Sequence, residues 1–231
     1  MGHYSLMEWK FKKLTRSDTK RGATQLEFFS GGDIGNWVDA LIREDIQNHL
    51  DAKKDEWPIT VTYSLGCLRQ RKAINRWFGG LMRHMQASEV QEELRNELRE
   101  LPAELPYLLI EDFGTTGLRG DPAETTDKTR GRERNDFYWF VRNVGRSSKK
   151  KGDRGRWGLG KTVYPASSRI RSFLTYTISE NSSDRGMLIG RSVLATHTLE
   201  DGEYDSEGYF AVLSGFAVVL RVPGIERKTA T

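Results

Sequence analysis

Alternating apolar and polar positions predict several β-strands along the chain. The clearest is residues 59–65, where apolar and polar residues alternate and β-branched side chains are common. Residues 107–110 form a short apolar run, which we expect to be a buried strand that leads into Asp112. Other strand-like patterns lie at residues 4–14 (a strand or an arm), 25–29, 172–178, 187–194, 210–213 and 216–222.

Apolar positions three and four residues apart predict a helix over residues 37–52. Its stripe, which includes Trp37 and Leu41, becomes polar over the last two turns. Glu44 and Asn48 are four residues apart, so they lie on one face of this helix. The polar end faces either solvent or a site, and the helix alone does not decide between these.

Further helices are predicted in the middle of the chain. Residues 135–144 are rich in aromatic side chains and predict a helix packed on the core. Residues 69–85 predict one helix, or pieces broken at Gly79–Gly80, and residues 88–101 predict a charged, solvated helix.

A glycine-rich loop at residues 155–161 precedes a predicted helix at residues 162–168. Gly155, Gly158 and Gly160 allow the backbone to approach a ligand closely, and main-chain N–H groups in such a turn can bind an anion. A glycine loop that opens a helix is a ready phosphate site. Taken alone, the glycines favour a flexible turn without a ligand.

A third motif begins at Asp112, at the end of a predicted strand. Gly114 and Gly117 follow it, so an acceptor carboxylate stands beside a backbone that a flat ligand can approach. An ordinary Asp-x-Gly turn is the alternative.

The composition limits the class of protein. The chain has 231 residues, which suits one sizeable domain, and its mean hydropathy is −0.62. No apolar run approaches the roughly 18 residues that a membrane helix needs. The charged start resembles no signal peptide, and the single cysteine, Cys67, excludes an internal disulfide framework or a cysteine-based zinc site. We therefore expect a cytoplasmic protein with no membrane part.

The charge distribution points to an anionic partner. The net charge is +4, and much of the local excess lies between Lys128 and Arg156. Such a segment binds nucleic acid or a nucleoside triphosphate, or is simply a solvated loop. The four histidines show no metal-ligand spacing along the sequence.

The three motifs occur in a fixed order: helical Glu-x-x-x-Asn, then Asp-x-Gly-x-x-Gly, then Gly-x-x-Gly-x-Gly. This ordered set resembles the GHKL ATPases, which include DNA gyrase B subunits, heat-shock chaperone ATPases of the ninety-kilodalton class, mismatch-repair ATPases and microrchidia proteins. The resemblance covers residues 37–168, most of the chain. It implies an α+β fold, a two-layer α/β sandwich whose mixed, mostly antiparallel sheet is covered on one face by helices.

The resemblance also implies roles for individual residues. Glu44 would be the general base that activates water, and Asn48 would bind Mg²⁺, which bridges the phosphates of ATP. Asp112 would accept a hydrogen bond from the adenine amino group. The other residues that the resemblance assigns to nucleotide binding are Asp51, Gly114, Gly117, Asn143, Lys149, Gly155, Gly158, Leu159, Gly160 and Lys161.

Simple chemistry agrees with these roles. Mg²⁺ is commonly held by one or two protein oxygens together with phosphates and waters, so a single Asn ligand suffices. Phosphoryl transfer depends mainly on positioning and charge neutralisation, and Glu44 is one helical turn from Asn48.

The implied organisation is a single ATP-binding domain over residues 1–231. Residues 1–35 would form an N-terminal arm, residues 119–154 an ATP lid, and we expect no C-terminal transducer domain. Thr115–Thr116 adds one residue to the usual Asp-x-Gly-x-Gly spacing of the family. Thr175 and Thr177 are candidates for the threonine that the family places on a late strand.

Three functions follow, in order of preference. The first is a slow, Mg²⁺-dependent ATPase whose lid closure and homodimerisation drive a larger process. The second is a nucleotide-binding interaction module without efficient hydrolysis, which acts with a partner protein or nucleic acid. The third is a nucleic-acid-binding protein without a nucleotide site.

Overall fold

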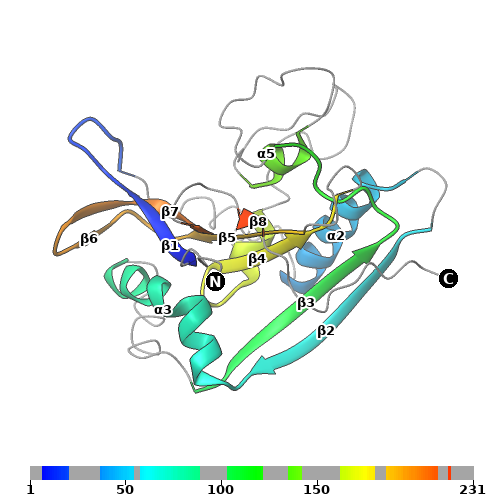
Figure 1. Cartoon of the computed structure of the whole chain (residues 1–231), viewed down its shortest axis with the longest axis horizontal. Coiled ribbons are helices and arrows are strands. Elements are labelled where there is room, and N and C mark those ends of the chain that lie inside the picture. The colour runs from blue at the N-terminus through cyan, green and yellow to red at the C-terminus, as the bar shows by residue number, and fades with distance from the viewer. Residues whose placement is uncertain are drawn as a thin grey trace, which may run out of the picture.

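The computed structural model has an α+β architecture, which confirms the class predicted from the sequence (Figure 1). It describes residues 7–20, 37–54, 58–88, 103–121, 135–141, 162–179, 186–212 and 218–219. The strand predicted at residues 25–29, the helix predicted at residues 88–101 (apart from Ser88) and the glycine loop at residues 155–161 lie outside these ranges.

In the described part of the chain, the larger of two sheets has six strands, and four of them follow the spatial order β1-β7-β5-β4. Two short strands complete it, because β6 pairs with β7 and β8 pairs with β5. All of these pairs are antiparallel. The strands are β1 (Met7–Lys13), β4 (Ser172–Thr177), β5 (Met187–Val193), β6 (His197–Leu199), β7 (Gly202–Val212) and β8 (Val218–Val219).

The second sheet is a two-stranded ribbon. Strand β2 (Thr60–Leu68) pairs with β3 (Leu105–Phe113) in one unbroken antiparallel register, from Thr60 opposite Phe113 to Leu68 opposite Leu105. The predicted strands at residues 59–65 and 107–110 are therefore partners. The prediction that 107–110 is buried was wrong: Tyr107, Leu108 and Leu109 are 49%, 42% and 44% exposed, because this pair of strands forms a separate ribbon outside the six-stranded sheet. The ribbon places the carboxylate of Asp112 at the end of β3, where a loop begins.

Helix α3 (Arg71–Ala87) covers one face of the six-stranded sheet. Leu81, Met82 and Met85 pack there against Trp9 and Phe210, which lie opposite each other in β1 and β7. The helix runs without a break through Gly79–Gly80, which settles the alternative left open by the sequence. A Cβ at Gly80 would lie 3.8 Å from the backbone N of Trp9, an ordinary contact distance, so α3 lies directly against β1.

The other face of the same sheet is covered by α2 (Trp37–Asp51), α5 (Asp136–Val141) and α6 (Val163–Ser167). Phe137 and Val141 of α5 pack on Ile189, whereas Val163 of α6 packs on Val193. Ile189 and Val193 point away from the α3 side, because successive side chains of a strand alternate between faces.

The described residues thus place helices on both faces of the larger sheet, in contrast to the one-sided cover that the resemblance implies. The physical reason is that both faces are apolar, so each needs a partner to exclude water. None of the helices in these ranges is long and apolar enough to cross a bilayer.

Two histidines far apart in sequence meet in the core between α3 and β6. Nδ1 of His197 lies 2.9 Å from the carbonyl oxygen of Ala195, so Nδ1 must carry the proton. Nε2 of His197 then accepts from Nδ1 of His84 at 2.7 Å, and Nε2 of His84 accepts from Nε of Arg83. An added proton on either ring would place two N–H groups against each other, so both rings are neutral.

This pair predicts sensitivity of the fold to acid. Burial, with the charges of His197 and Arg83, lowers the pKa of His84 to about 3, and burial also lowers the pKa of His197. Because these folded-state pKa values lie below the unfolded value of about 6.5, the stabilisation is complete above pH 6.5 and is lost as pH falls. We expect His84 to lower the free energy of unfolding by about 1 kcal/mol between pH 7 and pH 5.5.

Denaturant titrations at these two pH values, together with NMR spectra of the imidazole rings, check this expectation. The ring signals of His84 are expected to show no protonation down to pH 5, and those of His197 to titrate below the usual pKa of a histidine. Titration of both rings near pH 6.5 would contradict the neutral pair.

Candidate functional site

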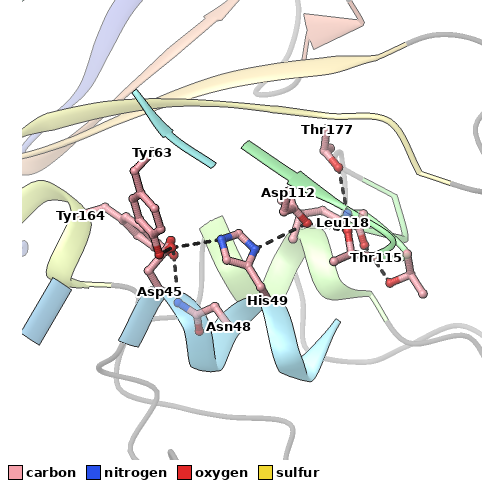
Figure 2. Close-up of polar contacts among 11 residues, drawn as sticks. Asp45, Asn48, His49, Tyr63, Asp112, Thr115, Leu118, Tyr164 and Thr177 are labelled. Carbon is pink, nitrogen blue, oxygen red and sulfur yellow. Dashed lines mark hydrogen bonds and ion pairs between the residues drawn. The ribbon is translucent and has the colours of Figure 1, made fainter. Parts of the chain in front are cut away.

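Helix α2 turns its polar side towards the rest of the protein (Figure 2). Its apolar half is anchored by Leu41, which packs against Val163, Ala166 and Val193. On the following turns Asp45 is buried, and Asn48 and His49 are partly buried. The polar end of this helix therefore lies against a cluster of side chains rather than facing solvent throughout.

Asp45 is the centre of that cluster. Its carboxylate is 1% exposed and accepts hydrogen bonds from the phenols of Tyr63, at 2.6 Å, and Tyr164, at 2.9 Å. Burial alone would raise the pKa of Asp45, but His49 and the two phenols outweigh that effect and hold it below its usual range. The carboxylate is thus ionised at neutral pH and ties together α2, β2 and α6.

His49 lies between two carboxylates. Nε2 is 3.2 Å from Oδ2 of Asp45, and Nδ1 is 3.5 Å from Oδ2 of Asp112. Nε2 makes no well-aligned hydrogen bond, so its attraction to Asp45 is mainly electrostatic. Burial would lower the pKa of His49, but Asp112 and Asp45 outweigh it and raise that pKa to about 9. The charged ring joins α2 to the end of β3.

The loop after Asp112 is fixed to the end of α2. The N–H of Thr116 donates to the carbonyl oxygen of Ala52 at 2.9 Å, and the N–H of Lys54 donates to the carbonyl oxygen of Gly114 at 3.3 Å. The hydroxyl of Thr115 donates to Oδ2 of Asp112. The Thr115–Thr116 pair, which lengthens the family spacing by one residue, therefore closes the loop on its own carboxylate and on the helix.

Both glycines of this loop are required by the backbone. Gly114 has φ +81° and Gly117 has φ +64°, a region that other residues rarely adopt. A Cβ at Gly114 would lie 2.2 Å from the carbonyl oxygen of Pro58, and one at Gly117 would lie 2.7 Å from that of Ile178. The loop is thus packed against backbone on two sides.

Thr177, at the end of β4, contacts the same loop. Its buried hydroxyl accepts a hydrogen bond from the N–H of Leu118 at 2.9 Å. Of the two late-strand candidates, Thr177 therefore lies at the Asp112–Gly117 loop, whereas Thr175 pairs with Ile189 further along β4. This contact also connects the ribbon to the six-stranded sheet.

The remaining predicted residues fall into three groups. Glu44 lies one turn before Asn48, with a side chain 28% exposed and an ion pair to Arg43 at 3.5 Å. Asp51 is exposed in the last turn of α2 and accepts from Nε2 of Gln47 at 3.1 Å, so it lies outside the buried cluster. The residues that fall outside the described ranges are Asn143, Lys149, Gly155, Gly158, Leu159, Gly160 and Lys161.

The side chains of this cluster would not complete the coordination of a metal ion by themselves, so a bound metal would also need ligands from a substrate or water. No group of three or more His, Cys, Asp or Glu side chains in the described ranges is arranged to hold a metal ion. An amide oxygen such as Oδ1 of Asn48 suits Mg²⁺, which usually retains waters and binds substrate phosphates. The residues therefore fit the implied Mg²⁺ only together with a phosphate ligand.

Comparison with known proteins gives no relative: no family model, no curated protein and no solved structure matches the chain.

Sequence reasoning missed most of the residues around Asp45. Asp45 and His49 are four residues apart on the polar side of a helix, and this spacing was a readable signal. No sequence signal pointed to Tyr63 or Tyr164. Tyr63 is 18 residues and Tyr164 is 119 residues from Asp45, so only the fold brings them together.

The tight packing of the Asp112–Gly117 loop predicts that one added methyl group at Gly117 destabilises the protein strongly. Gly117→Ala places a Cβ against Ile178 and Thr177 at a positive φ, so we expect the free energy of unfolding to decrease by roughly 2 kcal/mol. Gly79→Ala is the matched control, because its Cβ would meet nothing within 4 Å in α3. That control should stabilise the protein by about 0.5–1 kcal/mol in the same denaturant titration. Equal midpoints for Gly117→Ala and the parent would contradict the loop packing.

Proposed function

We propose that the chain is a GHKL-type module that binds ATP with Mg²⁺ and hydrolyses it slowly. The observation that carries the proposal is the direct attachment of the Asp112 loop to α2. This attachment brings Asp112, the implied base acceptor, to the cluster that includes Asn48, the implied metal ligand, and His49 links Asp112 to Asp45 there.

The assigned roles agree with the environment of each side chain. Burial would raise the pKa of Asp112, but His49 and Thr115 outweigh it and keep that pKa below its usual range, so the carboxylate accepts hydrogen bonds at neutral pH. Asp45 is occupied by its own partners and serves the fold. Glu44, partly exposed on the adjacent position, is then the carboxylate of this turn that can reach a water.

When bound, Mg²⁺ would neutralise phosphate charge and orient the γ-phosphate. Asn48 would hold the ion through its amide oxygen. Glu44 would accept the proton of the water that attacks the γ-phosphate. Gly114 and Gly117 would let the base approach the backbone beside Asp112.

Lid closure and homodimerisation on nucleotide binding belong to the same proposal. Apolar side chains on α2 are exposed at four-residue intervals (Val38, Ile42, Ile46 and Leu50), which supports association with another protein surface. Sizing the protein with and without Mg²⁺ and a non-hydrolysable ATP analogue tests this part, and an unchanged monomer would contradict it.

Glu44→Ala separates binding from turnover. We expect this variant to bind the Mg²⁺–ATP analogue within about twofold of the parent in calorimetric titration, while ATP hydrolysis falls by about 100-fold or more, because a general base is lost. Asp39→Ala, an exposed acid in the first turn of the same helix, is the control and should hydrolyse ATP at the parent rate.

Unchanged hydrolysis by Glu44→Ala would show that another group is the base. Micromolar binding by a parent that has no turnover would favour the interaction module, and no nucleotide binding at all would overturn the proposal.

Asp112→Asn tests the base acceptor. An amide at this position presents donors as well as an acceptor, and it loses the charge that His49 matches, so we expect ATP affinity to fall by about tenfold or more. Glu111→Gln, the exposed neighbouring residue on β3, is the control and should bind as the parent does. Equal affinity of Asp112→Asn and the control, measured by competition with a fluorescent ATP analogue, would exclude Asp112 from the base pocket.

A further inference from the structure

The phenol of Tyr164 lies between Asp45 and the implied metal ligand Asn48 (Figure 2). Its oxygen is 2.9 Å from Oδ1 of Asp45 and 3.0 Å from Nδ2 of Asn48. Tyr164 comes from α6, 116 residues after Asn48, so the contact depends on the tertiary fold.

The chemistry of these three groups fixes the direction of both hydrogen bonds. An ionised Asp45 can only accept, so the single phenolic proton of Tyr164 must point to it. Tyr164 can then only accept from Asn48, which means that the NH₂ group of Asn48 faces the phenol. An amide carries its oxygen on the opposite branch, so Oδ1 of Asn48 is turned away from this cluster.

We propose that Tyr164 is a positioning residue, which holds the Asn48 side chain so that its amide oxygen, rather than its NH₂ group, is presented to the metal ion. The presence of the metal ion rests on the proposed function. The orientation of the Asn48 amide rests on the hydrogen-bond network. A flipped amide would direct an N–H donor at a cation, which no metal accepts as a ligand.

The arrangement around Asp45 makes this orientation persistent. Tyr63 donates to Oδ2 of Asp45 at 2.6 Å, which leaves Oδ1 for Tyr164. Burial and the charge of Asp45 raise the pKa of Tyr164 well above its usual value, so the phenol keeps its proton. The network therefore has one consistent assignment of protons.

The chain supplies a matched pair of variants. Tyr63→Phe and Tyr164→Phe each remove one phenol that donates to Asp45, but only Tyr164→Phe removes the partner of Asn48. Affinity for an ATP analogue is measured for both full-length variants by calorimetry, in excess Mg²⁺ and in excess EDTA.

We expect Mg²⁺ to strengthen nucleotide binding in the parent and in Tyr63→Phe by the same factor. In Tyr164→Phe that factor should fall by about tenfold, with affinity in EDTA unchanged, because residues that orient a metal ligand typically change metal affinity by this amount. In an Asn48→Ala background, Tyr164→Phe should cause no further loss, since it acts through Asn48.

A readout without nucleotide tests the orientation itself. The side-chain NH₂ signals of Asn48, assigned by their loss in Asn48→Ala, should shift in Tyr164→Phe and stay in place in Tyr63→Phe. The alternative result is that Tyr63→Phe and Tyr164→Phe have equal effects on these signals, or on the factor by which Mg²⁺ strengthens nucleotide binding. Either result would overturn the inference while leaving the proposed function intact. A parent whose nucleotide binding ignores Mg²⁺ would overturn the proposed metal, and the inference with it.

Discussion

A carboxylate that is taken out of water must be matched by donors, and the rest of the site depends on how Asp45 meets this requirement. Its oxygens are matched by Tyr63, Tyr164 and His49, which come from three different elements. Removing one donor would leave a charge partly unmatched in the interior, so the partners cannot drift independently. This constraint holds α2, β2 and α6 in one arrangement, in which Tyr164 also accepts a hydrogen bond from Asn48.

The same helix connects the two sheets. The loop after Asp112 is hydrogen-bonded to the end of α2, and the next residues of the loop contact Thr177 at the end of β4. The ribbon and the six-stranded sheet therefore meet at the loop that carries the implied base acceptor. Glycines at positive φ make such a tight meeting possible, and any side chain there would collide with backbone.

Much of the fold followed from local pattern, and the exceptions have physical causes. Residues 37–52 and 59–65 were predicted correctly because their periodicity is strong. Residues 107–110 do form a strand, but their apolar run wrongly predicted burial, since Tyr107, Leu108 and Leu109 are exposed on the two-stranded ribbon. The hairpin of β6 and β7 was mostly missed, since Gly202–Gly208 is polar and reads as a loop. The continuity of α3 through Gly79–Gly80 is supported by the packing of Leu81, Met82 and Met85 on the sheet, which local propensity does not contain. Asn48 and Asp112 were named from motifs and Thr177 as one of two candidates, whereas the contacts of Tyr164 and His49 arise only from the tertiary structure.

The central claim is that α2 and the Asp112–Gly117 loop bound one nucleotide site. It is tested most directly by NMR spectra of the full chain during addition of Mg²⁺ and a non-hydrolysable ATP analogue. The account predicts the largest changes at Asn48, Gly114, Gly117 and Thr177, with the signals of His84 and His197 on the opposite face of the sheet unchanged. Changes confined to the α3 side of the sheet, or no change at millimolar analogue, would contradict it.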